Sequence, residues 1–321
     1  MLSDILKEKK CFKLVCGAGN EDEKEVEKLV YLYSKAGCNL FDLSAKPEIV
    51  DAAKRGLKRS GITENRYLSV SVGIKGDPHI SKAYINSEKC IKCGACAITC
   101  PQRTIFEHET SYEVNPIKCI GCEKCLHACP AQSIEMKSES KDLTEILPPL
   151  IKQGIDCVEF HAIVDDDKEI FEKWKDINDC YSGLVSICTD RSKLGNDALL
   201  QRTVRMLDGK KPYSVIIQAD GAPMSGGEDD YRTTLQSIAA AEVFEKANLP
   251  VYLLVSGGTN SKTTELAKMC GIEISGVAIG SFARKIVAQY IDRTDFWDNK
   301  EIFEKALVVA KNLVETSLKY L

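Results

Sequence analysis

Eight cysteines in the first half of the chain form two copies of one pattern, C-x2-C-x2-C-x3-C-P. In this bacterial ferredoxin pattern, three cysteines of a run bind one [4Fe–4S] cluster and the fourth binds the other cluster. The spacing therefore predicts two [4Fe–4S] clusters with crossed ligands. The first cluster is assigned to Cys90, Cys93, Cys96 and Cys129. The second is assigned to Cys119, Cys122, Cys125 and Cys100.

The internal repeat extends beyond the cysteines, since Ile85-Asn86 and Lys89 match Val114-Asn115 and Lys118. Each half is therefore expected to form a strand, a tight cluster loop, a short helix and a second strand. A zinc site or a disulfide knot would be the alternative. Zinc sites rarely combine eight thiols at this double spacing, and disulfides are unfavourable in a reducing compartment.

The composition is that of an ordinary soluble globular protein, with 44% hydrophobic residues, 28% charged residues and a net charge of −4 among 321 residues. There is no basic block to suggest nucleic-acid binding. No apolar stretch reaches the roughly 20 residues of a membrane span, and the first residues lack the apolar run of a signal peptide. We therefore expect a cytoplasmic protein, with a photosynthetic organelle as the other compatible compartment.

Seven further cysteines are scattered along the chain without a second ligand spacing. Most fall in expected strands, where a free thiol behaves as a small buried hydrophobe. Their odd number also argues against a secreted disulfide scaffold. They are Cys11, Cys16, Cys38, Cys157, Cys180, Cys188 and Cys270.

Outside the cysteine repeat, apolar strands alternate with helices. Expected strands cover residues 12–16, 39–43, 67–74, 157–163, 184–188, 213–218, 251–255 and 276–279. Eight such units predict an α/β protein with a (β/α)8 TIM-like barrel and an inserted α+β ferredoxin-like domain. An open doubly wound sheet is the alternative, but no early G-x-G-x-x-G marks a switch point. The expected units are residues 1–79 and 138–321 for the barrel and 80–137 for the insertion.

The helix pattern adds two local expectations. Residues 143–152 read as a short helix interrupted by Pro148-Pro149. Asp166 and Asp167 are expected to be solvated residues that cap the next helix.

The insertion follows the third strand, which places it among the loops at the C-terminal face of the barrel, where such enzymes keep their sites. Glycine-rich loops follow the last two strands and could bind a phosphate group through backbone N–H groups. The candidate residues are Gly257, Gly258, Gly280, Ser281 and Arg284. Glycines that only allow the chain to turn are the alternative.

Polar residues near other strand ends are further candidates for ligand contacts. Asp42 ends the second strand, Glu159 and His161 lie near the end of the fourth, and Asp220 lies at the end of the sixth. Asp220 belongs to the segment Gln218–Gly227, which leads from this strand into a loop. No Ser/His/Asp order, P-loop or radical SAM spacing is present in the sequence.

Several segments together resemble one family, the cyanobacterial light-dependent period proteins of LdpA type. They are FKLVCGA, the double cysteine run after GDPH, QADGAPMSGG, SGGTN and GVAIGSFAR. The resemblance implies an iron–sulfur protein linked to redox sensing by the circadian clock. The eight cysteines carry over as cluster ligands, and no catalytic residues carry over.

Two functions follow from these observations. The first is a redox sensor or electron-transfer protein that acts with a redox partner protein or a regulatory complex. The alternative is a flavin- or phosphate-ligand-dependent oxidoreductase fed by its own ferredoxin domain. FMN is the less favoured cofactor, because no strand end other than Lys75 offers a cation for a flavin ring. A simple electron carrier would leave most of the chain without a purpose.

Overall fold

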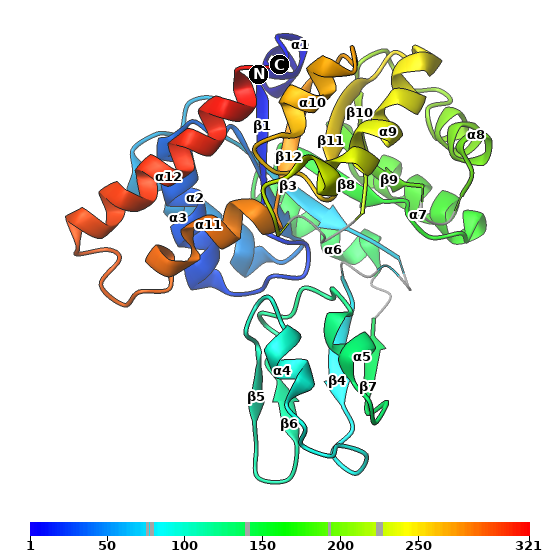
Figure 1. Ribbon diagram of the computed structural model, residues 1–321. Coiled ribbons are helices and arrows are strands. Elements are labelled where there is room, and N and C mark those ends of the chain that lie inside the picture. Colours follow the sequence, from blue (N-terminus) through cyan, green and yellow to red (C-terminus); the bar gives the residue numbers. More distant parts are fainter. Residues whose placement is uncertain (75–76, 78–79, 139–141, 192–193, 223–226) are drawn as a thin grey trace.

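The structure is a computed structural model that describes residues 1–74, 77, 80–138, 142–191, 194–222 and 227–321 (Figure 1). Eight parallel strands close into a barrel in the order β1-β12-β11-β10-β9-β8-β3-β2. The strands are β1 (Cys11–Val15), β2 (Leu40–Ser44), β3 (Tyr67–Val72), β8 (Cys157–His161), β9 (Leu184–Asp190), β10 (Val215–Asp220), β11 (Tyr252–Ser256) and β12 (Gly276–Ile279). The predicted (β/α)8 barrel and its eight strands are confirmed.

The helices pack around the outside of this barrel (Figure 1). They are α2 (Glu23–Ala36), α3 (Pro47–Ser60), α6 (Leu143–Lys152), α7 (Asp167–Cys180), α8 (Asn196–Met206), α9 (Tyr231–Ala247), α10 (Thr263–Met269), α11 (Ser281–Ile291) and α12 (Lys300–Leu318). The barrel strands are buried almost throughout, because helices cover one face and barrel side chains fill the other. A long apolar core joins these helices to the strands.

A short helix, α1 (Leu2–Lys7), closes the N-terminal end of the barrel. Leu2 and Leu6 pack there against buried strand residues such as Leu40 and Ile216. The C-terminal end is consequently the open end of the barrel, where a ligand can enter. This helix was not expected from the sequence, because six residues are too few to show a helical period.

Three local details differ from or agree with the sequence-based expectations. The expected interruption at Pro148 and Pro149 is wrong, since α6 continues through both prolines. Each proline lacks an N–H and so removes one helical hydrogen bond, but the fixed φ of proline is compatible with a helix. Asp166 caps α7 by accepting a hydrogen bond from the Glu169 amide at 3.0 Å, as expected. Asp167 begins that helix and pairs with the buried Arg202 at 2.6 Å.

The insertion forms two short antiparallel sheets, in agreement with the predicted two-fold repeat. β4 (Lys82–Ile85) pairs with β7 (Ile134–Lys137), and β5 (Ile105–Glu107) pairs with β6 (Tyr112–Val114). The short helices α4 (Ala95–Thr99) and α5 (Lys124–Ala128) pack against each other, α4 also against β5 and α5 against β7. The insertion has its own small core and projects from one end of the barrel (Figure 1). None of the helices in the described residues is long and apolar enough to cross a membrane.

Candidate functional site

The eight repeat cysteines line two separate cavities of the insertion. One cavity is lined by Cys90, Cys93, Cys96 and Cys129. The other is lined by Cys100, Cys119, Cys122 and Cys125. Each cavity thus combines three cysteines of one run with the last cysteine of the other run. The exchange arises because Cys100 and Cys129 end α4 and α5, and these two helices pack against each other.

The two cysteine loops have the same backbone conformation although their sequences differ. Lys92 and its counterpart Gly121 both have positive φ, 54° and 69°. Gly94 and its counterpart Glu123 also both have positive φ, 77° and 59°. Each loop therefore places one non-glycine residue in the left-handed region, at a cost that the rest of the loop must offset. Gly94 and Gly121 supply the other position of each turn, where a residue without a side chain adopts positive φ at no steric cost.

The cavities suit an iron–sulfur cluster chemically. Four thiols converge in each, and apolar side chains such as Ile85 and Ile105 surround them. Backbone amides also point at sulfur: the Ala83 N–H donates to Cys119 Sγ at 3.4 Å and the Ser133 N–H to Cys129 Sγ at 3.3 Å. Hydrogen bonds of this kind stabilise thiolate ligands and tune cluster potentials.

The second cysteine run lies against the barrel. Glu21, in the loop after β1, donates its amide to the Ile117 carbonyl at 2.8 Å. Lys82 Nζ donates to the Cys119 carbonyl at 2.8 Å and also to the carbonyl of Gly19. Ile120, between two cysteines of this run, is buried and lines the pocket at the barrel mouth. The cavity of Cys119 and its partners is therefore the one next to the barrel.

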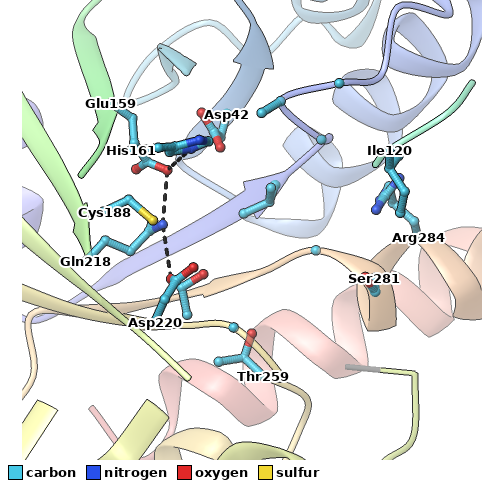
Figure 2. Close-up of a pocket in the computed structure, with 18 residues that line it drawn as sticks. Asp42, Ile120, Glu159, His161, Cys188, Gln218, Asp220, Thr259, Ser281 and Arg284 are labelled. Atoms are coloured by element: carbon cyan, nitrogen blue, oxygen red, sulfur yellow. Dashed lines mark hydrogen bonds and ion pairs between the residues drawn. The ribbon is translucent and has the colours of Figure 1, made fainter. Parts of the chain in front are cut away.

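The barrel pocket has two ends of different character (Figure 2). Arg284, Ser281 and Ile120 lie at one end, and Asp42, Glu159 and His161 lie at the other. Every residue of the predicted phosphate site lines this pocket, namely Gly257, Gly258, Gly280, Ser281 and Arg284. The structure thus brings together two loops that are more than 20 residues apart in the sequence. Arg284 belongs to the first turn of α11 rather than to a loop, because the helix begins directly after β12.

At the other end, a network of charged side chains is buried in the barrel. Lys13 Nζ, from the middle of β1, pairs with Glu159 Oε2 and donates to Gln218 Oε1 at 2.8 Å. Asp42 Oδ2 lies 3.8 Å from Lys13 Nζ, and Asp42 Oδ1 accepts a hydrogen bond from Ser71 Oγ at 2.7 Å. These groups satisfy one another without solvent, as buried charges require.

His161 extends this network toward the pocket. Its Nδ1 lies 2.7 Å from Asp77 Oδ2, and its Nε2 lies 3.7 Å from Glu159 Oε1. Gln218 Nε2 donates to that same Glu159 oxygen at 3.0 Å. Cys188 and Asp220 complete this wall of the pocket. Asp42, Glu159, His161 and Asp220 were all candidates from the sequence, and the structure brings them together.

The proton affinities of these groups are shifted in different directions. Burial would lower the pKa of Lys13, but Asp42 and Glu159 outweigh it and raise that pKa above its usual value. Burial raises the pKa of Asp42 to about 6, with Lys13 acting against it. Burial would raise the pKa of Glu159, but Lys13 and His161 hold it below its usual range. A buried acid with a pKa near neutrality beside permanent charges is suited to proton transfer.

Two lysines, Lys13 and Lys75, bear on whether the pocket has a cation near it. One buried cation was not expected from the sequence: Lys13, in the middle of β1, lies below the pocket in the same network as Glu159 and Gln218. Lys75 itself lies outside the described residues, as do residues 223–226 of the loop after β10. The signal for Lys13 was available: a lysine in the centre of an otherwise apolar strand, CFKLV, needs a buried counter-ion.

The cysteine cavities and the closed barrel together define an iron–sulfur protein built on a (β/α)8 barrel. A family model described as "4Fe-4S dicluster domain" matches residues 83–136. A second model, "Light dependent period A C-terminal domain", matches residues 149–316, which is just over half of the chain. The chain belongs to the light dependent period A (LdpA) family.

Individual relatives agree with this assignment. The "Light dependent period A" protein of Synechococcus elongatus is 29% identical over 293 residues, which cover 88% of this chain and 82% of that protein. The ferredoxin of Megasphaera elsdenii is 55% identical over 29 residues, 9% of this chain and 54% of the ferredoxin. Among solved structures, the YdjI aldolase from Escherichia coli K12 has a TM-score of 0.50 at 7% identity, covering 99% of this chain and 94% of its own. This likeness shows the barrel fold alone.

Proposed function

We propose that this protein is a redox sensor that binds two [4Fe–4S] clusters. Cys90, Cys93, Cys96 and Cys129 hold one, and Cys119, Cys122, Cys125 and Cys100 hold the other. The lining of the two cysteine cavities supports this crossed assignment, since each cavity has four thiols in the required combination. When bound, the clusters supply one-electron transfer.

The observation that carries the proposal is the place of Ile120. This residue lies between Cys119 and Cys122, and its side chain lines the barrel pocket. A change of charge at the second cysteine cavity therefore acts directly on the barrel mouth. The first cavity, farther from the barrel, is the entry point for electrons from a redox partner protein, and the barrel conveys the redox state to a regulatory complex.

Membership of the LdpA family supports a role in light-dependent timing. The relative in Synechococcus elongatus is called "Light dependent period A". We extend to this chain a redox input to the circadian clock, with the cytoplasm as its compartment. In this proposal the barrel and the insertion act together, because residues 117–122 transmit the state of the cysteine cavity to the barrel.

Hydrogen exchange in the two redox states tests the sensor proposal. Anaerobic holoprotein would be compared as isolated and after reduction with dithionite. We expect amide protection to change in residues 17–19 and in the first turn of α11, which line the pocket together with Ile120. Helix α8, remote from the insertion, serves as the internal control. Identical exchange in both states throughout the barrel would contradict a sensor.

One observation favours a second function, an oxidoreductase fed by the insertion. Lys13, Glu159, His161 and Asp42 form a buried network of shifted proton affinities under the pocket, which is typical of catalytic sites. Lys13 places a cation below this pocket, although its side chain does not line it.

A flavin titration separates the enzyme from the sensor. Anaerobic protein would be titrated with FMN and, as a control for the phosphate group, with riboflavin. Stoichiometric FMN binding, followed by bleaching of the flavin when the clusters are reduced, would favour the oxidoreductase. Unchanged flavin spectra at all protein concentrations would leave the sensor as the function.

A further inference from the structure

Arg284 is a buried cation whose hydrogen-bonding groups are largely unused. Its side chain is only 6% exposed. Nε and Nη1 have no hydrogen-bond partner among the described residues. Unsatisfied N–H groups on a buried guanidinium are costly, so they indicate a ligand that accepts from them.

Two backbone features point to the same end of the pocket. The N-cap of α11, Gly280, has no side-chain cap, so the first amides of this helix are free to bind an anion. Gly257 and Gly258, in the loop after β11, adopt positive φ, 70° and 81°, and both line the same pocket, where they present backbone rather than side-chain atoms. Arg284, the helix N-terminus and this loop are therefore three independent donors around one space.

The charged residues near Arg284 indicate that the ligand is an anion. Glu25 is the carboxylate that acts most strongly on the guanidinium, and it is itself partly buried with a raised pKa, chiefly because of that burial. It is not among the residues that line the pocket. A phosphate group carries close to two negative charges near neutral pH and accepts from several donors at once, which matches this donor set.

The second cysteine cavity lies beside this anion site. Ile120, between Cys119 and Cys122, lines the pocket together with Arg284. Gly19, another pocket residue, shares the Lys82 ammonium group with the Cys119 carbonyl. An anion at Arg284 and an electron added at this cavity therefore repel each other across a protein interior.

We propose that Arg284, the N-terminus of α11 and the loop at Gly257–Gly258 bind the phosphate group of a small phosphate ester, and that this binding is coupled to reduction of the cluster at Cys119. The coupling rests on the proposed function; the phosphate site itself does not. The rest of the ester extends toward Asp42, Glu159 and His161, whose polar groups suit hydroxyl or carbonyl substituents.

The expected size of the coupling follows from Coulomb's law. In a protein interior with an effective dielectric constant of about 20, a negative charge added near a bound anion is expected to weaken its binding roughly tenfold. By reciprocity, phosphate then lowers the cluster potential by the same factor, which is about 59 mV for one electron. Reduced protein should bind phosphate about tenfold more weakly than oxidised protein.

Binding is tested first on oxidised holoprotein by calorimetry with inorganic phosphate and with glycerol 3-phosphate. Saturable binding is expected, and Arg284→Gln should weaken it at least tenfold. Lys285→Gln removes the same charge from the neighbouring, exposed residue, which pairs with Glu228 at 3.1 Å, and should change binding less than twofold. No saturable binding by the wild type, or equal binding by Arg284→Gln, overturns the phosphate site.

A second variant, Ser281→Asp, distinguishes loss of the phosphate site from misfolding of Arg284→Gln. Ser281→Asp places a carboxylate at the first position of α11, where helices favour one, and should abolish phosphate binding while the fold is kept. The cluster potential is then titrated by EPR with and without saturating phosphate. A fall of about 59 mV in the wild type and none in Ser281→Asp is expected. An unchanged wild-type potential overturns the coupling, whereas missing cluster signals would overturn the proposed function instead.

Discussion

Lys118, directly before Cys119, forms an ion pair with Asp22 at the start of α2, with 3.0 Å between Nζ and Oδ2. Asp22 also caps that helix by accepting from the amides of Lys24 and Glu25. Asp22 thus caps its own helix and also forms the ion pair that anchors the second cysteine run to the barrel. Lys89, the repeat equivalent of Lys118, is exposed. The two halves of the insertion are alike in sequence, but of the two cysteine runs it is the second that contacts the loop after β1, together with Lys82 of β4.

This pair predicts that Lys118→Gln loosens the insertion from the barrel. The pair is partly exposed, so a loss of about 0.5–1 kcal/mol is expected, or roughly two- to fivefold faster amide exchange in residues 117–122. Hydrogen exchange followed by mass spectrometry measures this. Lys89→Gln is the matched control and should leave exchange in its own run unchanged. Equal effects of the two variants would show that the ion pair does not anchor the insertion.

The crossed ligand sets predict which cluster each cysteine variant damages. Cys129→Ser should disturb the cluster of Cys90, Cys93 and Cys96, while Cys100→Ser should disturb the one at Cys119. EPR spectra of the two reduced variants should therefore lack different signals. Cys270→Ser, an exposed thiol outside the repeats, should keep both signals. Loss of the same signal in both cluster variants would be incompatible with crossing.

The buried network predicts a large cost for removing Lys13. Lys13→Met leaves Glu159 and Asp42 without their counter-ion and should lower the free energy of unfolding by about 3–5 kcal/mol. The double variant Lys13→Met/Glu159→Gln removes both charges and should recover a substantial part of that loss. Anaerobic urea unfolding followed by circular dichroism measures both. Lys9→Met, on the surface, is the control. A double variant as unstable as the single one would disprove the charge pairing.

The raised pKa of Asp42 predicts a dependence of stability on pH. Its folded pKa of about 6 lies above the ordinary 3.8, so the folded protein holds this proton more tightly than the unfolded chain. Its stabilising contribution is present at low pH and is lost as pH rises through 6. Asp42→Asn cannot ionise, so its stability relative to the wild type should rise between pH 4 and 7, by up to about 3 kcal/mol. A pH-independent difference in melting temperature would refute this.

The separate cores predict that the barrel folds without the insertion. The two barrel cores contain no residue between 80 and 137, and the insertion core contains only residues from within that range. Deleting residues 80–137 and joining the ends by a short Gly/Ser linker should leave a soluble protein with a helical circular dichroism spectrum. Aggregation with several linker lengths would show instead that the insertion is required for folding.

Much of this architecture could be predicted because local sequence determines it. The apolar strands have a recognisable length and spacing, and the cysteine runs carry their ligand geometry in the sequence. The glycines after β11 and β12 also indicated the pocket end that contains Arg284. In each case the informative residues are close together in the sequence.

Other features depend on contacts between distant residues. The role of Lys13 emerges only when β1, β8 and β10 close the barrel and bring Glu159 and Gln218 to its ammonium group. The docking of Lys118 on Asp22 likewise joins residues almost 100 positions apart. Helix α11 was missed because Gly280 and Ser281 read as a loop, although they form the start of a helix.

The claim that two iron–sulfur clusters occupy the insertion, with one at the barrel pocket, is tested most directly by EPR. Protein purified anaerobically would be reduced with dithionite and its spins counted against its concentration. The account predicts about two spins per chain, with the line broadening of two neighbouring [4Fe–4S] clusters. About one spin per chain, or no signal and bound zinc instead, would contradict it.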